Sequence, residues 1–448
     1  MTPDATVERT ASAVDDRSTR PDTSAAPLLA AVLLGGLAVR AAYASARHLC
    51  FGDESCYLWL AQNLSSGAGY TYYNGTPELH FPPLFPVALG VLNWIVRDWE
   101  AVSRVAYVLF GSLLPLPAFL LGKEMYGRRV GLIASLLTAV LPAFTTGILF
   151  AETLSEPLYL LCLFTGIYFV FKASVSRAYR HFTLAGVMLS LAYLTRSEGQ
   201  LYFAVGILFL AGVLRFYRSP SLAEAALRLL ACAAAFLLVA SPYVIYLHSH
   251  TGHWALDTKS TTSYTTTRGL VHHDGEAFQR DTWGLSEKGE VKYSAHELGE
   301  SLPELLLGKY RDRVIPDVRA NLGNAWNAIQ RPWVCGRWFL ALALLGFAGT
   351  IAGRKRYSAE VLNLMVAGSL ASVLVFFITE RFLYGLLLPV LLWSACGLDH
   401  LLQAIAKAPA PASRSFRAAC RGLQAVILAG VVGYLGLAGW RHFETKTP

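Results

Sequence analysis

The chain has 448 residues, of which 54% are hydrophobic and only 15% are charged. Soluble domains carry roughly a quarter charged residues, so this composition argues against a large soluble enzyme and is typical of a membrane protein. The formal net charge of +8 first indicates Lys and Arg in cytoplasmic loops, and we expect no nucleic-acid partner.

Apolar runs dominate the chain after a polar start. Residues 1–26 lack any apolar run and are expected to form a disordered cytoplasmic tail. The runs that follow are close to the roughly 20 residues that a helix needs to cross a bilayer. About eleven are found, at 27–49, 101–122, 129–147, 153–173, 181–195, 199–216, 225–247, 336–353, 359–378, 382–404 and 420–440. They predict an all-α polytopic membrane protein with about 11 transmembrane helices.

A further run at 81–97 is ambiguous, and positive charge decides how it is placed. Lys and Arg accumulate in cytoplasmic loops, so a correct set of crossings should place all of their clusters on one side. The clusters lie near 123–129, 172–180, 215–228, 354–356 and 407–421. If 81–97 does not cross, all of them fall on the side of the N-terminal tail. We therefore expect 81–97 to be a short interfacial helix on the outer surface.

The same parity places residues 50–100 and 248–335 outside, together with short turns near 148–153, 196–199 and 379–381. The 248–335 segment is polar and predicts a small soluble insertion with an amphipathic helix near 300–329. The expected organisation is thus a membrane module at 27–247, an outer loop region at 248–335 and C-terminal membrane helices at 336–448.

The first outer loop begins with an acidic pair. Asp53 and Glu54 directly follow the first span, and the apolar residues after them recur at helical spacing, which predicts an interfacial helix. Two interpretations stay open for the pair: catalysis or substrate binding, or simple charges at the favourable first turn of that helix. The same alternatives apply to Glu152 and Glu156, at the outer start of the fourth span.

Arginines occur in two outer turns, where the bias in charge makes them unusual. Arg196 lies in the turn before the sixth span, and Arg381 lies before a late span. Each has a carboxylate neighbour, Glu198 and Glu380, that offers an alternative structural role as an ion-pair partner.

Four short elements carry a resemblance to a known superfamily. They are Asp53-Glu54 after the first span, His80-x-Pro82-Pro83-Leu84, Leu194-Thr195-Arg196-x-Glu198-Gly199 and Arg381-Phe382-Leu383. In their order and shared side they resemble the GT-C glycosyltransferases that use polyprenyl-phosphate sugars. This group includes protein O-mannosyltransferases and lipid A aminoarabinose transferases, of the glycosyltransferase family 39 type.

The resemblance implies a GT-C type fold and an inverting transfer of a sugar from a polyprenyl phosphate to an extracytoplasmic acceptor. Asp53, with Glu54 beside it, would act as the base or orient the acceptor, because a hydroxyl is a weak nucleophile at neutral pH. Cations would bind the lipid phosphate, where charge develops. The implied substrate-binding residues are His80, Glu152, Glu156, Arg196, Arg381 and Tyr384. No cofactor is established, but a divalent metal stays an open alternative, with Asp53, Glu54, Glu152 and His80 as possible ligands.

The sequence departs from the aminoarabinose transferases at one element. Where those enzymes have Glu-Lys-Pro, this chain has His80-Phe81-Pro82, so the lysine expected near the phosphate must be replaced from elsewhere. Two alternative functions are a secondary transporter and an envelope-glycan polymerase or ligase. We expect a multi-pass protein of the bacterial inner membrane with its active site facing the periplasm.

Overall fold

Helices make up almost all of the described chain, as the composition predicted. A computed structural model describes residues 25–47, 52–72, 75–150, 154–218, 221–266, 271–272, 274–276, 284–285, 291–292, 302–353, 357–376, 378–406 and 414–446. Within these ranges the only strands are β1 (Gly284–Leu285) and β2 (Val291–Lys292), a short antiparallel pair. The all-α fold class is therefore confirmed.

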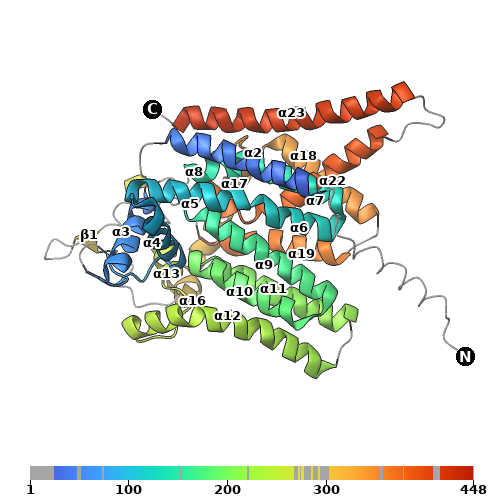
Figure 1. Cartoon of the computed structure of the whole chain (residues 1–448). Helices are drawn as coiled ribbons and strands as arrows, with labels where there is room; N and C mark the ends of the chain where they lie inside the picture. Colours follow the sequence, from blue (N-terminus) through green and yellow to red (C-terminus); the bar gives the residue numbers. More distant parts are fainter. Residues whose placement is uncertain are drawn as a thin grey trace, which may run out of the picture.

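The helices run in chain order through one bundle (Figure 1). They are α2 (Ala26–Ser45), α3 (Asp53–Ser66), α4 (Leu84–Val96), α5 (Trp99–Leu113), α6 (Pro115–Tyr126), α7 (Arg128–Val140), η1 (Pro142–Phe144), α8 (Thr146–Leu149), α9 (Glu156–Ser176), α10 (Tyr179–Thr195), α11 (Gly199–Val213), η2 (Leu214–Arg218), α12 (Leu222–Thr251), α13 (Lys259–Thr266), α16 (Leu302–Glu304), η4 (Leu305–Lys309), α17 (Arg311–Ile329), α18 (Arg337–Ala352), α19 (Tyr357–Gly368), α20 (Leu370–Val373), α21 (Glu380–Leu383), α22 (Leu387–Ala406) and α23 (Arg414–Lys446).

Seven helical segments among the described residues are long and apolar enough to cross a membrane, which makes the chain a multi-pass membrane protein. All of the predicted apolar runs fall on helices, but the predicted number of crossings is not confirmed by this criterion. Four of the runs form helices of only 12 to 17 residues: α7, α10, α18 and α19.

The predicted single span at 129–147 is interrupted, because proline ends the helix. Helix α7 stops at Val140, and Pro142 opens the short helix η1, since a proline cannot donate a backbone hydrogen bond to the preceding turn. The buried guanidinium of Arg40 in α2 donates to the carbonyls that this break leaves open. Its distances are 3.3 Å to Thr138, 3.2 Å to Ala139 and 2.9 Å to Phe144.

Helices α3, α4 and α13 lie together at one end of the bundle (Figure 1). Helix α4, the ambiguous run, has 13 residues, a length of about 20 Å, whereas the hydrocarbon core is about 30 Å thick. It packs on α3 at Gly90, where a Cβ atom would come within 2.9 Å of Ser65 Oγ. Helix α5 then starts from this same end, which agrees with the expectation that 81–97 does not cross.

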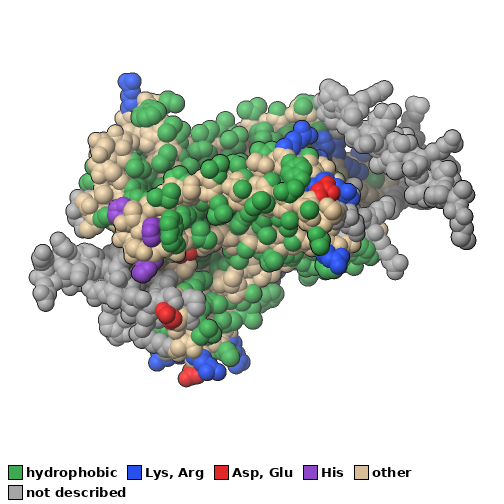
Figure 2. Space-filling model, turned by 90° about the horizontal axis from the view of Figure 1, so that it is seen from below, with side chains coloured by type: hydrophobic (Ala, Val, Ile, Leu, Met, Phe, Trp, Pro, Cys, Tyr) green, Lys and Arg blue, Asp and Glu red, His purple; other side chains and the backbone are tan. Residues whose placement is uncertain are grey.

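The surface of the bundle is mainly apolar along its length. Figure 2 shows hydrophobic side chains over the middle of one face, while charged side chains are sparse and gather toward the ends and edges. The loops after α6, α9 and α11, with their Lys and Arg residues, lie at the end opposite α3 (Figure 1). This distribution agrees with the parity argument from the sequence.

Candidate active site

Asp53 and Glu54 are the first two residues of α3, as predicted, and both lie in its first turn. Gly52 caps the helix with φ 52°, a conformation that costs glycine little. The Asp53 side chain is 35% exposed, with its Oδ2 at 3.4 Å from Arg381 Nη1. The acidic residue that the sequence singled out therefore meets the late arginine across 328 residues of chain.

Glu54 has entirely different surroundings from its neighbour. Its carboxylate is 1% exposed and accepts two hydrogen bonds from Arg47, at 2.5 and 3.2 Å. Ser103 in α5 donates a third, at 2.5 Å. Arg104 in turn donates to the Arg47 carbonyl, at 2.7 Å. Glu54 thus ties the end of α2, the start of α3 and α5 together, and its acceptor positions point into that junction.

Arg196 follows α10 and is buried among partners from two other helices. Its Nη1 lies 2.9 Å from Glu156 Oε1 and 3.3 Å from Ser155 Oγ, and its Nη2 lies 2.9 Å from Glu198 Oε1. Burial acts to lower the pKa of Arg196, but Glu198 and Glu156 outweigh it and raise the pKa well above its usual value. Burial likewise opposes ionisation of Glu198, yet Arg196 lowers the pKa of that carboxyl to about 2.

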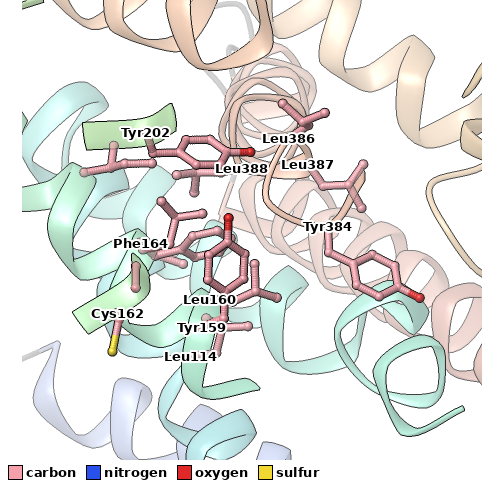
Figure 3. Close-up of a cluster of buried hydrophobic side chains, with 14 of the residues drawn as sticks. Leu114, Tyr159, Leu160, Cys162, Phe164, Tyr202, Tyr384, Leu386, Leu387 and Leu388 are labelled. Atoms are coloured by element: carbon pink, nitrogen blue, oxygen red, sulfur yellow. The ribbon is translucent and has the colours of Figure 1, made fainter. Parts of the chain in front are cut away.

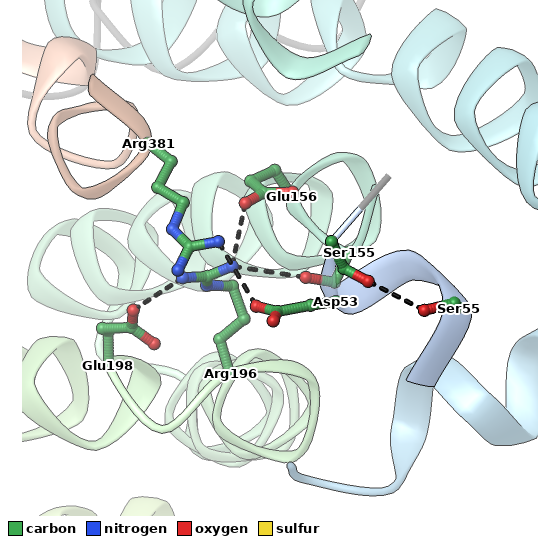
Figure 4. Close-up of polar contacts among 8 residues, drawn as sticks. Asp53, Ser55, Ser155, Glu156, Arg196, Glu198 and Arg381 are labelled. Carbon is green, nitrogen blue, oxygen red and sulfur yellow. Dashed lines mark hydrogen bonds and ion pairs between the residues drawn. The ribbon is translucent and has the colours of Figure 1, made fainter. Parts of the chain in front are cut away.

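Arg381 lies beside this buried group. Figure 4 shows the guanidinium groups of Arg381 and Arg196 close together, with Asp53, Glu156 and Glu198 around them. The Phe382 ring is near both, with its centre 5.3 Å from Arg381 Cζ and 5.9 Å from Arg196 Cζ. We call Asp53, Arg381, Arg196, Glu156 and Glu198 the charged cluster.

Lys259, the first residue of α13, is a cation that the sequence analysis missed. Its Nζ lies 5.2 Å from the centre of the Phe81 ring. Burial lowers the pKa of its ammonium, and the other charges that act on it all belong to the charged cluster: Glu198, Arg196, Asp53 and Arg381. The segment after α12 thus brings a lysine close to the charged cluster.

The segment that carries Lys259 is fixed by several side chains. Thr258 Oγ1 donates to the Leu79 carbonyl, and Tyr193 Oη donates to the Leu256 carbonyl. Asp257 accepts from Gln200 and from the backbone N–H of Ser260, the latter at 2.8 Å. Three of these contacts join residues more than 50 positions apart in sequence, so no local pattern could have indicated where Lys259 lies.

The two remaining described candidates, His80 and Tyr384, have other neighbours. The His80 ring lies edge-on against Phe81, with centroids 5.1 Å apart, and its backbone N–H donates to the buried Glu78 carboxylate. Tyr384 belongs to a buried hydrophobic cluster (Figure 3) and its hydroxyl would meet a Cβ atom on Gly147 at 2.9 Å. Glu152 lies outside the described residues.

No group of three or more His, Cys, Asp or Glu side chains within the described residues could hold a metal ion. Two histidines of the 248–335 segment have other contacts: His248, near the end of α12, stacks on Trp254 with centroids 4.0 Å apart, and His272 lies 2.7 Å from Asp317. Of the four ligands considered from sequence, Asp53 and Glu54 face different partners, and Glu152 is not described.

Comparison with known proteins supports the predicted superfamily. Residues 80–246 match the family model described as dolichyl-phosphate-mannose-protein mannosyltransferase. No curated protein sequence matched the chain significantly.

Solved structures of GT-C glycosyltransferases have a similar fold. The apo oligosaccharyltransferase of Archaeoglobus fulgidus has a TM-score of 0.60 at 16% identity, over 95% of this chain and 56% of that one. The archaeal oligosaccharyltransferase AglB from Archaeoglobus fulgidus, in complex with an inhibitory peptide and a dolichol-phosphate, has a TM-score of 0.55 at 16% identity, over 92% of this chain and 56% of that one. ArnT from Cupriavidus metallidurans bound to undecaprenyl phosphate has a TM-score of 0.54 at 14% identity, over 94% and 76%.

This chain therefore spans just over half the length of the oligosaccharyltransferase. The resemblance to GT-C glycosyltransferases and the fold class predicted from sequence are both confirmed.

Proposed function

We propose that this GT-C fold protein is an inverting glycosyltransferase that moves a sugar from a polyprenyl phosphate to an extracytoplasmic acceptor. The observation that carries the proposal is the partly exposed pair of Asp53 and Arg381 beside the buried ions around Arg196. A lipid-linked donor is supported by the family match and by the lipid phosphates named with AglB and ArnT.

The reaction needs one base and one site for negative charge. The acceptor hydroxyl attacks the anomeric carbon of the sugar from the face opposite the phosphate, and Asp53 accepts its proton. The bond between that carbon and the phosphate oxygen breaks, and its electron pair leaves on the lipid phosphate. Inversion follows because there is a single displacement. Preorganised cations then stabilise the charge that develops on the leaving phosphate.

The three cations near Asp53 divide into two kinds. Arg196 is 5% exposed and already paired with two carboxylates, so it has little charge left for a ligand. Arg381 is 20% exposed, and its ion pair with Asp53 is longer, at 3.4 Å. We therefore assign the phosphate to Arg381 and Lys259, and we assign to Arg196 and Glu156 the role of holding the cluster in place.

We also assign to Lys259 the role of the lysine that is missing from the element His80-Phe81-Pro82. A phosphate near Arg381 and Lys259 would release Asp53 from its contact with Arg381, because the anion competes for the same guanidinium. Asp53 would then be free to accept a proton from the acceptor. Glu54, buried against Arg47, would set the orientation of the first turn of α3 and so of Asp53.

We place the active site on the periplasmic face of a bacterial inner membrane. The support is that α3, α4 and α13 lie at the end of the bundle opposite the loops that are rich in Lys and Arg (Figure 1). The nature of the sugar and of the acceptor, whether glycan, lipid or protein, is to be read from a donor and acceptor panel.

The Asp53→Asn variant tests the function directly. It keeps the size of the side chain but cannot accept the proton, so kcat should fall by about 100-fold or more. Transfer is measured in proteoliposomes from a panel of polyprenyl-phosphate sugars. Glu100→Gln removes an exposed carboxylate at the start of α5 and should leave transfer unchanged.

Thermal unfolding of both variants in detergent should match the wild type, because Asp53 is partly exposed and its ion pair with Arg381 is long, at 3.4 Å. Undiminished transfer by Asp53→Asn would refute its role as the base. Transport of a solute by the wild type, without transfer from any donor, would instead favour a secondary transporter.

A further inference from the structure

Glu380, the neighbour of Arg381, does not pair with it. Its carboxylate forms an ion pair with Arg331. It also accepts from the indole N–H of Trp333, at 3.0 Å to each oxygen. The sequence analysis considered an ion pair between Glu380 and Arg381, but the carboxylate of Glu380 contacts Arg331 and Trp333 instead.

Arg331 and Trp333 belong to a tight turn after α17 that is itself well anchored. Val334 and Cys335 in this turn are buried. Gly336 closes it, with φ 76° and an N–H that donates to the Ile329 carbonyl at 3.1 Å. That backbone conformation strains residues other than glycine. Arg331 and Trp333, the partners of Glu380, therefore lie in a turn that is fixed by burial and by a backbone hydrogen bond.

A second contact from α17 holds the chain just before Arg381. Asn321 is buried, and its side-chain amide donates to the carbonyls of Leu374, at 2.9 Å, and Phe376. Helix α17 thus contacts the segment between α20 and α21 through Asn321 and, by way of the turn that follows it, through Glu380.

The C-terminal helix completes this arrangement from the other side. The buried His442 of α23 stacks on Trp333, with ring centroids 5.2 Å apart and planes 6° apart. His442 Nδ1 also lies 3.3 Å from Thr146 Oγ1 in α8. Trp333 is thereby held between His442 and Glu380, and one continuous set of contacts runs from α23 to the residue beside Arg381.

We infer that Glu380 is a positioning residue for Arg381 and is itself held by Trp333 and Arg331. In this way α17, the turn that follows it and the end of α23 set the position at which Arg381 meets the donor phosphate. We call Asn321, Arg331, Trp333, Glu380 and His442 the arginine clamp. The inference rests on the proposed function only in its last step, the role of Arg381 toward phosphate.

A double-mutant cycle tests whether Glu380 acts through Arg381. Glu380→Gln should raise the donor KM about tenfold, equivalent to about 1.4 kcal/mol of binding, with a smaller effect on kcat. Trp333→Phe should act in the same direction, whereas Trp326→Phe, an exposed tryptophan on α17, should have no effect. In an Arg381→Met background, Glu380→Gln should add nothing. If the effects of Glu380→Gln and Arg381→Met on the donor KM multiply in full in the double variant, the clamp is refuted.

A labelling experiment tests the same clamp without any need for activity. In a variant whose own cysteines are replaced, Arg381→Cys is modified with a charged methanethiosulfonate reagent. Adding Glu380→Ala or Trp333→Ala should increase the modification rate several-fold, because the segment is no longer held. An unchanged rate would overturn the clamp, whereas lack of sugar transfer by the wild type would overturn only the proposed function.

Discussion

Asp53 and Glu54 are adjacent in sequence, yet their carboxylates have different chemistry. Successive helical residues point about 100° apart, since a turn contains 3.6 residues. One carboxylate therefore meets Arg381 while the other enters the junction of α2 and α5. The sequence could identify the acidic pair from its place after the first span, but it could not separate the two residues. That separation depends on Arg47 and Ser103, which no motif indicates.

The two arginines illustrate the same limit. The sequence singled out Arg196 and Arg381 because arginine is unusual in outer turns. Their burial distinguishes them: Arg196 is enclosed by Glu156 and Glu198, whereas Arg381 stays partly open. A buried ion pair must be well hydrogen-bonded to offset its desolvation, and Arg196 meets that condition. This difference in burial is the reason why we propose Arg196 as support for the cluster and Arg381, with Lys259, as the cations for the phosphate.

Lys259 gives a prediction about pH. The pKa of its ammonium is lowered by burial, and the usual value for lysine is about 10.4. Because the folded-state pKa is lowered, the cation is lost at a lower pH than for an ordinary lysine. The donor kcat/KM should thus decline on the alkaline side. In Lys259→Arg this decline should move to higher pH, since arginine stays charged.

The measurement is the pH profile of transfer in wild type and Lys259→Arg. As a matched control, Arg313→Lys changes an exposed outer-segment cation on α17 and should leave the profile where it is. An alkaline limb that does not respond to Lys259→Arg would show that another group controls it.

At the scale of elements, the end of α7 shows how a break in a helix is tolerated inside a membrane protein. Carbonyl groups without donors are costly where water is absent, and Pro142 leaves several of them. Arg40 supplies donors from α2 to three of the carbonyls near this break. A charged residue within the first span is thus explained by local structure and needs no transport function.

Arg40→Met should therefore destabilise the protein without changing the charged cluster. Each buried carbonyl that loses its donor costs about 1 to 3 kcal/mol of folding free energy. All of the lost hydrogen bonds come from the one guanidinium group of Arg40. The midpoint of thermal unfolding in detergent should fall clearly. Arg97→Met, which changes an exposed residue at the end of α4, should leave it unchanged. Equal midpoints for Arg40→Met and wild type would contradict this account.

Helix positions were predicted more accurately than helix lengths. The apolar runs located the elements because period and composition are local properties. The sequence did not reveal that 129–147 ends at Val140 or that 359–378 ends at Gly368 and continues as the short helix α20. These endings depend on proline and on tertiary contacts. The predicted helix near 300–329 is present mainly as α17, from Arg311 to Ile329.

At the scale of the whole molecule, positive charge was the most informative signal. The parity of crossings kept 81–97 at the surface, and the structure has α4 beside α3 at one end of the bundle (Figure 1). What charge could not predict is the convergence of α3, α9, α10, α11, α13 and α21 on one site. Such convergence arises from packing between distant segments, and each contributes only one or two polar side chains.

The orientation of this bundle in the membrane can be tested with two matched serines. Ser249 is exposed near the end of α12, on the side of α13, and Ser176 is exposed at the opposite end, in the last turn of α9. In a variant without other cysteines, Ser249→Cys should react with a membrane-impermeant maleimide in intact cells. Ser176→Cys should react only after the membrane is permeabilised, because its end carries the Lys and Arg clusters. The reverse pattern would place the charged cluster in the cytoplasm, where an extracytoplasmic acceptor could not reach Asp53.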